Sequence, residues 1–167
     1  MPVVDALAFV KNKSSENARP IEMLVEGINI EIWHDKHYAI RQQFGDENGR
    51  REGIEQEIVM KLIRGAVKHL FYYSFKVKFF SFISDEGQHL RYPRIILQKE
   101  DLDGILLNVA IELHCISLDK YEITVFTAMK KDDFKMSQGQ FAIQLYGNSE
   151  SELKKFENGK LLTISNI

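Results

Sequence analysis

The clearest pattern along the chain is a set of apolar residues at helical spacing between positions 54 and 71. Residues four apart lie on the same side of a helix, so a stripe with this spacing is typical of a helix that faces a core. The spacing therefore predicts an amphipathic helix over residues 54–71. Its apolar stripe consists of Ile54, Ile58, Leu62, Ala66 and Leu70.

Alternation of apolar and polar residues predicts strands elsewhere, because successive side chains of a strand point to opposite faces. Two long alternating runs flank a short loop in the C-terminal half, which indicates a β-hairpin. The segment that follows the predicted helix is rich in aromatic and β-branched residues and predicts a further strand. The predicted strands are 28–33, 72–83, 88–98, 105–117, 121–129 and 140–146, with Pro93 marking an edge strand or a kink.

The hairpin pattern also predicts which residues face each other. A two-residue loop at Asp119 and Lys120 pairs His114 with Val125 and Glu112 with Thr127. Glu112, His114 and Thr127 then share a polar face, where a site could lie, and a one-residue slip would reverse the faces. The opposite, core face consists of Val109, Ile111, Leu113 and Cys115.

These elements predict an α+β fold in which N-terminal helices pack on an antiparallel sheet, with an extra strand pair. A short helix over residues 34–44 is expected to precede the main helix, because the glycines at 45 and 49 end its pattern. We expect residues 1–27 to form an N-terminal arm and linker, residues 28–146 a single domain, and residues 147–167 a C-terminal tail.

Length and composition are those of an ordinary globular domain. The chain has 167 residues, of which 44% are hydrophobic and 28% charged. Its single cysteine, Cys115, excludes an internal disulfide, and its place on the apolar face favours a core residue over a nucleophile. The sequence contains no apolar run of the roughly 20 residues that a membrane span needs, and its N-terminus is a poor signal peptide. We therefore expect a cytoplasmic protein without a membrane partner.

The charge is unevenly distributed. A formal charge of −2 argues against a strongly basic nucleic-acid binder. Residues 34–99, however, carry 12 Lys/Arg against 8 Asp/Glu, whereas the remainder carries 10 against 16. Such an imbalance either marks a face for an anionic partner or arises by chance.

The candidate chemistry lies in the predicted helix over residues 34–44. His37 and Arg41 fall one turn apart, and Arg50 and Arg51 follow just before the main helix. Cleavage of RNA through its own 2′-hydroxyl needs a base, an acid and fixed positive charge at the phosphorane, and histidine and arginine suit these roles. The alternative is a solvated helix face whose charges keep the protein soluble.

The order of strand, H-x-x-x-R, R-x-G-I, helix and antiparallel sheet resembles the barnase–colicin–RelE superfamily of small ribonucleases. The matching elements span about residues 28–130 and include His37, Arg41 and the segment Arg51–Ile54. The resemblance implies metal-independent action on RNA, with His37 as acid or base, Arg41 and Arg51 directed at phosphate, and an antitoxin-like protein as a partner. The chain departs from the family in lacking a strongly basic charge.

Other residues complete the predicted site. His114 is the preferred candidate for a second catalytic group, since the hairpin register places it beside Glu112; His69 and His89 are further candidates. Substrate contacts are expected from Arg50 and, by stacking or by phosphate binding, from Trp33, Lys76 and Lys78. Trp33 would otherwise fill the core, and the two lysines would otherwise be solvated.

Metal binding is the other use for these histidines. His34 and His37 could share an ion with His69, His89 or Glu112, but no second pair has ligand spacing, so we expect no metal and no cofactor.

Two functions from different classes follow. The first is a metal-independent endoribonuclease or RNA-binding domain, and whether it is an enzyme stays open. The second is a non-catalytic protein-interaction module that uses edge strands. Salt discriminates between them, because added salt weakens nucleic-acid binding steeply and an apolar interface hardly at all.

Overall fold

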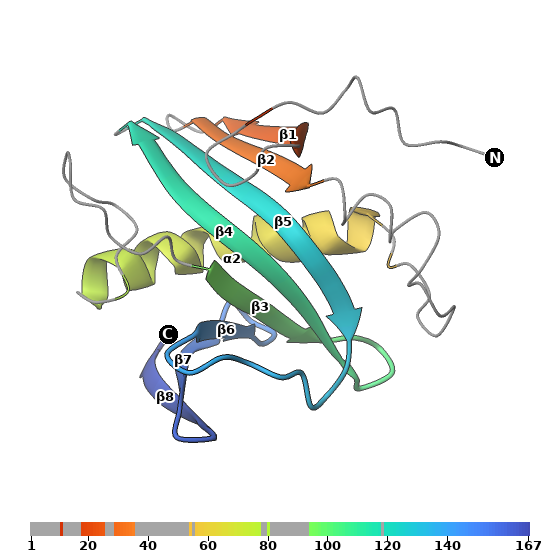
Figure 1. Ribbon diagram of the computed structural model, residues 1–167, viewed down its shortest axis with the longest axis vertical. Helices are drawn as coiled ribbons and strands as arrows, with labels where there is room; N and C mark the ends of the chain where they lie inside the picture. The colour runs from red at the N-terminus through yellow and green to blue at the C-terminus, as the bar shows by residue number, and fades with distance from the viewer. Residues whose placement is uncertain are drawn as a thin grey trace.

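A computed structural model describes the protein at residues 11, 18–25, 29–35, 54, 56–77, 80, 94–117 and 119–167. These residues form an eight-stranded sheet and the helix α2 (Gln56–Lys76). In Figure 1, α2 crosses behind the sheet at the level of its central strands. One face of the sheet is therefore covered by α2. The other face points away from α2 and toward the viewer in Figure 1, and we call it the far face because it is the one distant from α2.

The strand order of the sheet is β1-β2-β5-β4-β3-β6-β7-β8. β2 pairs in parallel with β5, and β3 pairs in parallel with β6, while all other pairs are antiparallel. The strands are β1 (Ala18–Val25), β2 (Asn29–Asp35), β3 (Arg94–Glu100), β4 (Leu106–Ser117), β5 (Lys120–Lys130), β6 (Phe141–Leu145), β7 (Ser151–Glu157) and β8 (Lys160–Asn166).

The predicted fold class is wrong. Two strands, β1 and β2, precede α2 in the chain and belong to the sheet, and the sheet is mixed rather than antiparallel. Alternating side chains identify a strand but not the strand it pairs with. The same alternation is found whether the neighbouring strand runs parallel or antiparallel. The N-terminal arrangement of helices packed on a sheet was inferred from order along the chain, and tertiary pairing decides otherwise.

The predicted main helix is confirmed, but it continues further than expected, and Ile58 of its predicted apolar stripe is exposed rather than buried. Residues 72–76, predicted as the start of a strand, form its last turn and a half. Leu70, Tyr73 and Val77 are buried at spacings of three and four, so the helical stripe persists through the aromatic run. Burial of this stripe outweighs the strand propensity of aromatic residues. No helix in the described ranges has the length and apolar character required to cross a bilayer.

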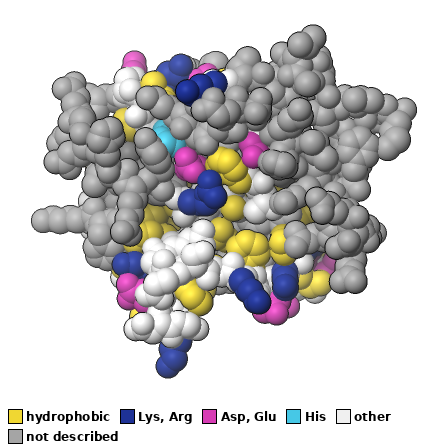
Figure 2. All heavy atoms as spheres, in the orientation of Figure 1, with side chains coloured by type: hydrophobic (Ala, Val, Ile, Leu, Met, Phe, Trp, Pro, Cys, Tyr) yellow, Lys and Arg dark blue, Asp and Glu magenta, His cyan; other side chains and the backbone are white. Residues whose placement is uncertain are grey.

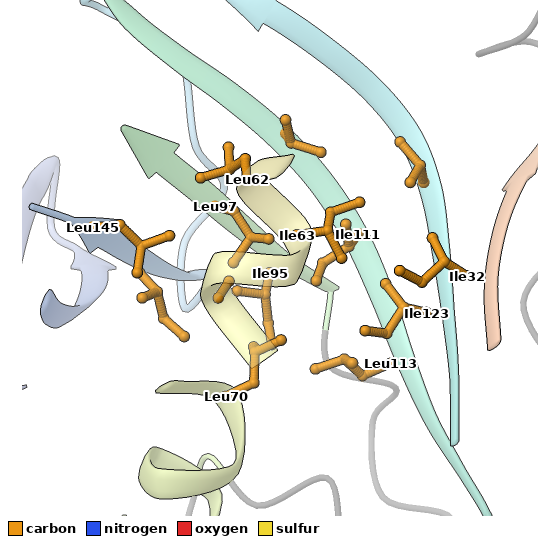
Figure 3. Close-up of a cluster of buried hydrophobic side chains, with 14 of the residues drawn as sticks. Ile32, Leu62, Ile63, Leu70, Ile95, Leu97, Ile111, Leu113, Ile123 and Leu145 are labelled. Atoms are coloured by element: carbon orange, nitrogen blue, oxygen red, sulfur yellow. The ribbon is translucent and has the colours of Figure 1, made fainter. Parts of the chain in front are cut away.

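The core lies between the inner face of α2 and the covered face of the sheet. Figure 3 shows Leu62, Ile63 and Leu70 of α2 directed at side chains from neighbouring strands. The buried strand residues that meet them include Ile32, Ile95, Leu97, Ile111, Leu113, Ile123 and Leu145. On the far face, a smaller buried cluster of Ile96, Ala110 and Ala142 packs against Phe134 and Met136 of the loop before β6.

The hairpin of β4 and β5 is confirmed, although its predicted register is wrong. Glu112 pairs with Thr124 and His114 with Glu122, because the loop begins one residue earlier and bulges interrupt the ladder at two places. Val109, Ile111 and Leu113 are in the core as predicted, and Cys115 packs against it. Thr127 pairs with Ala110, not with Glu112. A bulge shifts every later pair, which alternation alone does not reveal.

Both predicted terminal segments contribute to the sheet. Residues 18–25, within the expected arm, form β1, and much of the expected tail forms β7 and β8. Of the predicted helix over residues 34–44, His34 and Asp35 are the last residues of β2, and residues 36–44 lie outside the described residues.

Candidate functional site

The outer face of α2 combines exposed positive charge with exposed aromatic rings. Its side chains recur every three or four residues opposite the buried stripe, as expected for one side of a helix. The sequence from Ile58 to Lys76 contains no Asp or Glu, and the only acidic residue of α2 is Glu57 in its first turn. We define the outer face by its exposed residues Lys61, Arg64, Lys68, Tyr72, Phe75 and Lys76.

Charge on this face differs in sign from that of the rest of the chain. α2 holds four Lys/Arg and one Asp/Glu, which leaves 18 of the 22 Lys/Arg and 23 of the 24 Asp/Glu for all other residues. Arg64 donates to the exposed carboxylate of Glu57 at 2.9 Å. Lys61 and Lys68 make no ion pair with any described residue. The outer face is thus a cationic stripe on an otherwise acidic chain.

The aromatic end of the outer face is organised by a lysine. The Nζ of Lys76 donates to the hydroxyl of Tyr72 at 2.8 Å and lies 5.1 Å from the centre of its ring. Tyr72 also packs edge-on against Tyr73, at 5.3 Å between ring centres. The other exposed ring at this end is Phe75, which at 76% exposure is more exposed than Tyr72. The result is a pair of aromatic rings next to a cation.

A buried polar network holds this end of α2 against the sheet. The Oγ of Ser151, the first residue of β7, lies 2.6 Å from Nδ1 of His69 and 2.8 Å from the hydroxyl of Tyr73. Burial and the charge of Lys68 lower the pKa of His69, so its neutral ring can accept the hydrogen bond from Ser151. Burial raises the pKa of Tyr73, so its hydroxyl stays protonated and shares a hydrogen bond with Ser151. His69, a candidate catalytic group by sequence, is therefore a structural link.

A second polar cluster lies on the far face of the sheet. Glu112 of β4 accepts from Nε2 of His114 at 2.8 Å and from Arg94 of β3 at 3.0 Å. The Arg94 guanidinium also lies over the ring of Phe126, at 4.4 Å from its centre. Figure 2 views this face and shows a histidine near acidic and basic side chains close to its centre. We call Glu112, His114 and Arg94 the acid–base cluster.

The acid–base cluster is charged but poorly accessible. Burial alone would raise the pKa of Glu112, but hydrogen bonds and positive charge from His114 and Arg94 outweigh it and lower that pKa. Glu112 is therefore ionised at neutral pH. The side chains of His114 and Glu112 are 5% and 10% exposed, against 51% for Arg94. Only the guanidinium side of the cluster is open to a ligand.

Trp33 belongs to the same row of the sheet as this cluster. Trp33 of β2 is in register with Thr124 of β5, which in turn is in register with Glu112 and, through it, with Arg94. Its indole nitrogen is buried, and no described residue accepts its hydrogen. The predicted strand-to-helix junction at Trp33 is not found, because β2 continues to Asp35.

Most of the predicted site falls outside the part of the chain that the structure describes. His37, Arg41, Arg50, Arg51 and Lys78 lie outside the described residues, so their convergence with His114 stays a prediction. Lys76 is exposed, but on α2 rather than on a strand, and α2 and the far face are on opposite sides of the sheet. The structure therefore separates Lys76 from Trp33 and His114.

Metal and thiol chemistry find little support in the described part of the chain. No three or more His, Cys, Asp or Glu residues gather there in a way that could hold an ion. Cys115 donates to the carbonyl of Ser117 at 3.3 Å, and burial raises its thiol pKa, which disfavours the nucleophilic thiolate. Cys115, predicted to be a buried core residue, is half-buried and packs against the core from its edge.

Two features of these sites escaped sequence reasoning. The pairing of Arg94 with Glu112 depends on the β3–β4 register, for which the sequence offers no local signal. The exposed rings of Tyr72 and Phe75 could have been found by extending the helical spacing from Leu70, since both fall opposite the buried stripe.

Comparisons with known proteins leave the family open. The predicted resemblance to small ribonucleases rests on short motifs, most of which lie outside the described residues, and the fold that it implied is not observed. No family model, curated protein or solved structure matches this chain.

Proposed function

We propose that the protein binds RNA through the outer face of α2. The observation that carries the proposal is the exposure of four cations and two aromatic rings on one side of a helix with no acidic residue beyond its first turn. Cations at helical spacing suit the phosphates of a flexible strand, and exposed rings suit its bases.

Charge segregation favours this surface over the rest of the molecule. The remaining residues carry a net negative charge, so the summed charge outside α2 does not favour a polyanion, whereas that of α2 does. Lys61 and Lys76 are 15 positions apart, which corresponds to about 22 Å along the helix axis. That length is enough for several nucleotides of an extended strand. Because α2 is fixed by its core stripe, the cations are presented on a rigid support.

Salt dependence tests the proposal quantitatively. Four phosphate contacts on a single strand predict a slope of about −3 for log K against log salt. A fluorescent oligouridylate would be titrated by anisotropy at several salt concentrations. Removing two charges with Lys61→Gln and Lys68→Gln should weaken binding and reduce the slope by about 1.4, while glutamine preserves the helix.

A matched double variant controls for total charge. Lys135 and Lys160 are exposed and lie outside α2, so Lys135→Gln with Lys160→Gln should leave affinity and slope unchanged. Equal weakening by both double variants, or a slope near zero for the unmodified protein, would contradict binding at α2. If the RNA slope is near zero and the protein instead binds a protein partner, the interaction-module alternative is favoured.

RNA cleavage is a second candidate function, favoured by the acid–base cluster. Ionised Glu112 could take the 2′-hydroxyl proton, His114 could protonate the departing 5′-oxygen, and Arg94 could hold the phosphoryl oxygens. This candidate ranks second because Glu112 is shielded, and a phosphate would have to draw Arg94 away from it. The cluster also lies across the sheet from α2, so an RNA bound to α2 does not reach it directly.

Cleavage would be measured in EDTA with a labelled RNA, since the proposed mechanism needs no metal. Glu112→Gln should lower the rate about 10²- to 10⁴-fold, the usual contribution of a positioned acid or base. Circular dichroism of the variant would show that it remains folded. Absence of cleavage by the unmodified protein, or an unchanged rate in folded Glu112→Gln, would exclude this role for the cluster.

A further inference from the structure

The aromatic residues of α2 are divided between two environments. Tyr73 is fully buried, and Phe71 packs edge-on against Tyr121 of β5 at 5.0 Å between ring centres. Tyr72 and Phe75 instead face solvent, at 38% and 76% exposure. Burying the aromatic run therefore does not explain the second pair. Their spacing of three residues makes them neighbours on the helix surface.

These two rings are attached to a well-anchored part of the helix. Tyr73, between them, is held by Ser151 through its hydroxyl and packs edge-on against Phe80 at 6.5 Å. Phe80 in turn packs against Phe141 of β6 at 5.2 Å. Lys76 further restrains Tyr72 through its hydroxyl. A partner that binds here pays little ordering entropy, because the backbone and one ring are already positioned.

Exposed rings beside cations match one feature of single-stranded RNA in particular. The bases of a single strand are free to stack on protein aromatics, whereas the bases of an A-form duplex are stacked inside the helix and cannot reach them. Every base has a flat face, so such stacking is tolerant of sequence. The lysines toward the start of α2 would hold the phosphates that follow the stacked bases.

We infer that Tyr72 and Phe75 form a base-stacking platform, so that the outer face of α2 selects single-stranded RNA over duplex RNA. The inference rests on the proposed function and adds the class of RNA that is bound. The platform lies at the C-terminal end of α2, and the phosphate contacts extend from it toward Lys61. Selectivity then comes from the rings, and charge supplies attraction common to all polyanions.

Binding would be compared for three probes: a single-stranded oligouridylate, an RNA duplex of equal length, and inorganic polyphosphate as a competitor without bases. Phe75→Ala should weaken binding of the single strand about 5- to 150-fold, the measured range for one stacked base. Its affinity for duplex and polyphosphate should stay unchanged. Phe75→Trp should restore single-strand binding, because the indole ring also stacks.

Ile58→Ala is the matched control. Ile58 is also an exposed apolar residue of α2, at 42% exposure, but it lies at the opposite end from the rings. Its replacement should change none of the three affinities. Because Ile58 and Phe75 are both exposed, neither variant should alter the melting temperature by more than a small amount.

The outcomes separate the platform from the proposed function. Unchanged single-strand binding in Phe75→Ala, or equal loss for all three probes, overturns the platform; continued weakening by Lys61→Gln with Lys68→Gln would then leave RNA binding at α2 intact. Failure of every nucleic-acid probe to bind the unmodified protein overturns both. Binding only to vesicles of phosphatidylserine and phosphatidylcholine, with loss in Phe75→Ala, would also overturn both and assign the face to an anionic membrane.

Discussion

The two sides of α2, a helix of 21 residues, differ in burial and in the kind of side chain that they carry. The inner side carries apolar residues that are nearly inaccessible, among them Ile63, Ala66 and Leu70. The outer side carries lysines and two exposed rings. Substitutions on the inner side should therefore change stability, whereas substitutions on the outer side should change binding and leave stability almost untouched.

The boundary between the two sides also separates two kinds of polar interaction. His69, at the edge of the inner side, is neutral and hydrogen-bonded within a buried network. Lys68, the next residue, is exposed and charged. A rotation of one residue, about 100°, is enough to move a side chain from a structural role to one available to a partner.

The largest expected effect is the creation of a cavity on the inner side. Ile63→Ala should lower the free energy of unfolding by about 2–5 kcal/mol, because Ile63 is fully buried beneath the sheet. Ile58→Ala, the same change on the exposed side, should stay within about 0.5 kcal/mol. Urea denaturation followed by circular dichroism measures both. Similar losses in the two variants would show that the sides are not distinct.

The next effect comes from the buried network that fastens α2 to β7. Ser151→Ala removes the hydroxyl that joins His69 and Tyr73 and leaves both of their polar atoms without a partner. The expected loss of unfolding free energy is about 1–3 kcal/mol. Exposed Ser137 provides the control, since Ser137→Ala should cost less than about 0.5 kcal/mol. Equal stability of the two variants would refute a structural role for the network.

A smaller effect is expected from a variant that keeps the hydrogen bonds of the network but removes the protonation of His69. Folding lowers the pKa of His69, so below about pH 6.5 the unfolded chain binds more protons than the folded protein. The free energy of unfolding therefore decreases as the pH is lowered. His69→Asn retains an acceptor near Ser151 and cannot be protonated. Its melting temperature should therefore decline less between pH 7 and pH 5 than that of the unmodified protein; parallel curves would refute the assignment.

The smallest expected effect is a gain on the outer side. Gly65 is exposed in the middle of α2, and a Cβ atom placed there would meet nothing within 4 Å. Gly65→Ala should raise the unfolding free energy by about 0.5–1 kcal/mol by restricting the unfolded chain and improving helix propensity. A loss of stability in thermal denaturation would indicate that this side of α2 is less open than the structure shows.

Local sequence patterns predicted the elements of this fold better than their arrangement. The stripe beginning at Ile54 identified the main helix, and the alternating runs identified β2, β4, β5 and β6. The parallel pairs β2–β5 and β3–β6 were missed, because pairing depends on contacts between residues far apart in the chain. The strand predicted after Phe71 failed for a related reason, since packing against the sheet favoured continuation of the helix.

The candidate sites follow the same division. Their ingredients were visible, including the positive charge of residues 34–99 and the individual residues Glu112, His114 and Lys76. The sequence did not show which of these residues lie together. Arg94 meets Glu112 only through the register of β3 with β4, and Lys76 lies far from His114 only because it belongs to α2.

By itself the sequence determined where the chain is helical or extended over most of its described length, and that its positive charge is concentrated around the main helix. These properties depend on neighbours within a few positions, where side-chain spacing decides which face is buried. Only the tertiary structure decided the strand order, the register, and which polar groups meet on the far face. Those choices depend on contacts between distant segments, and a single bulge changes them while leaving the local pattern intact.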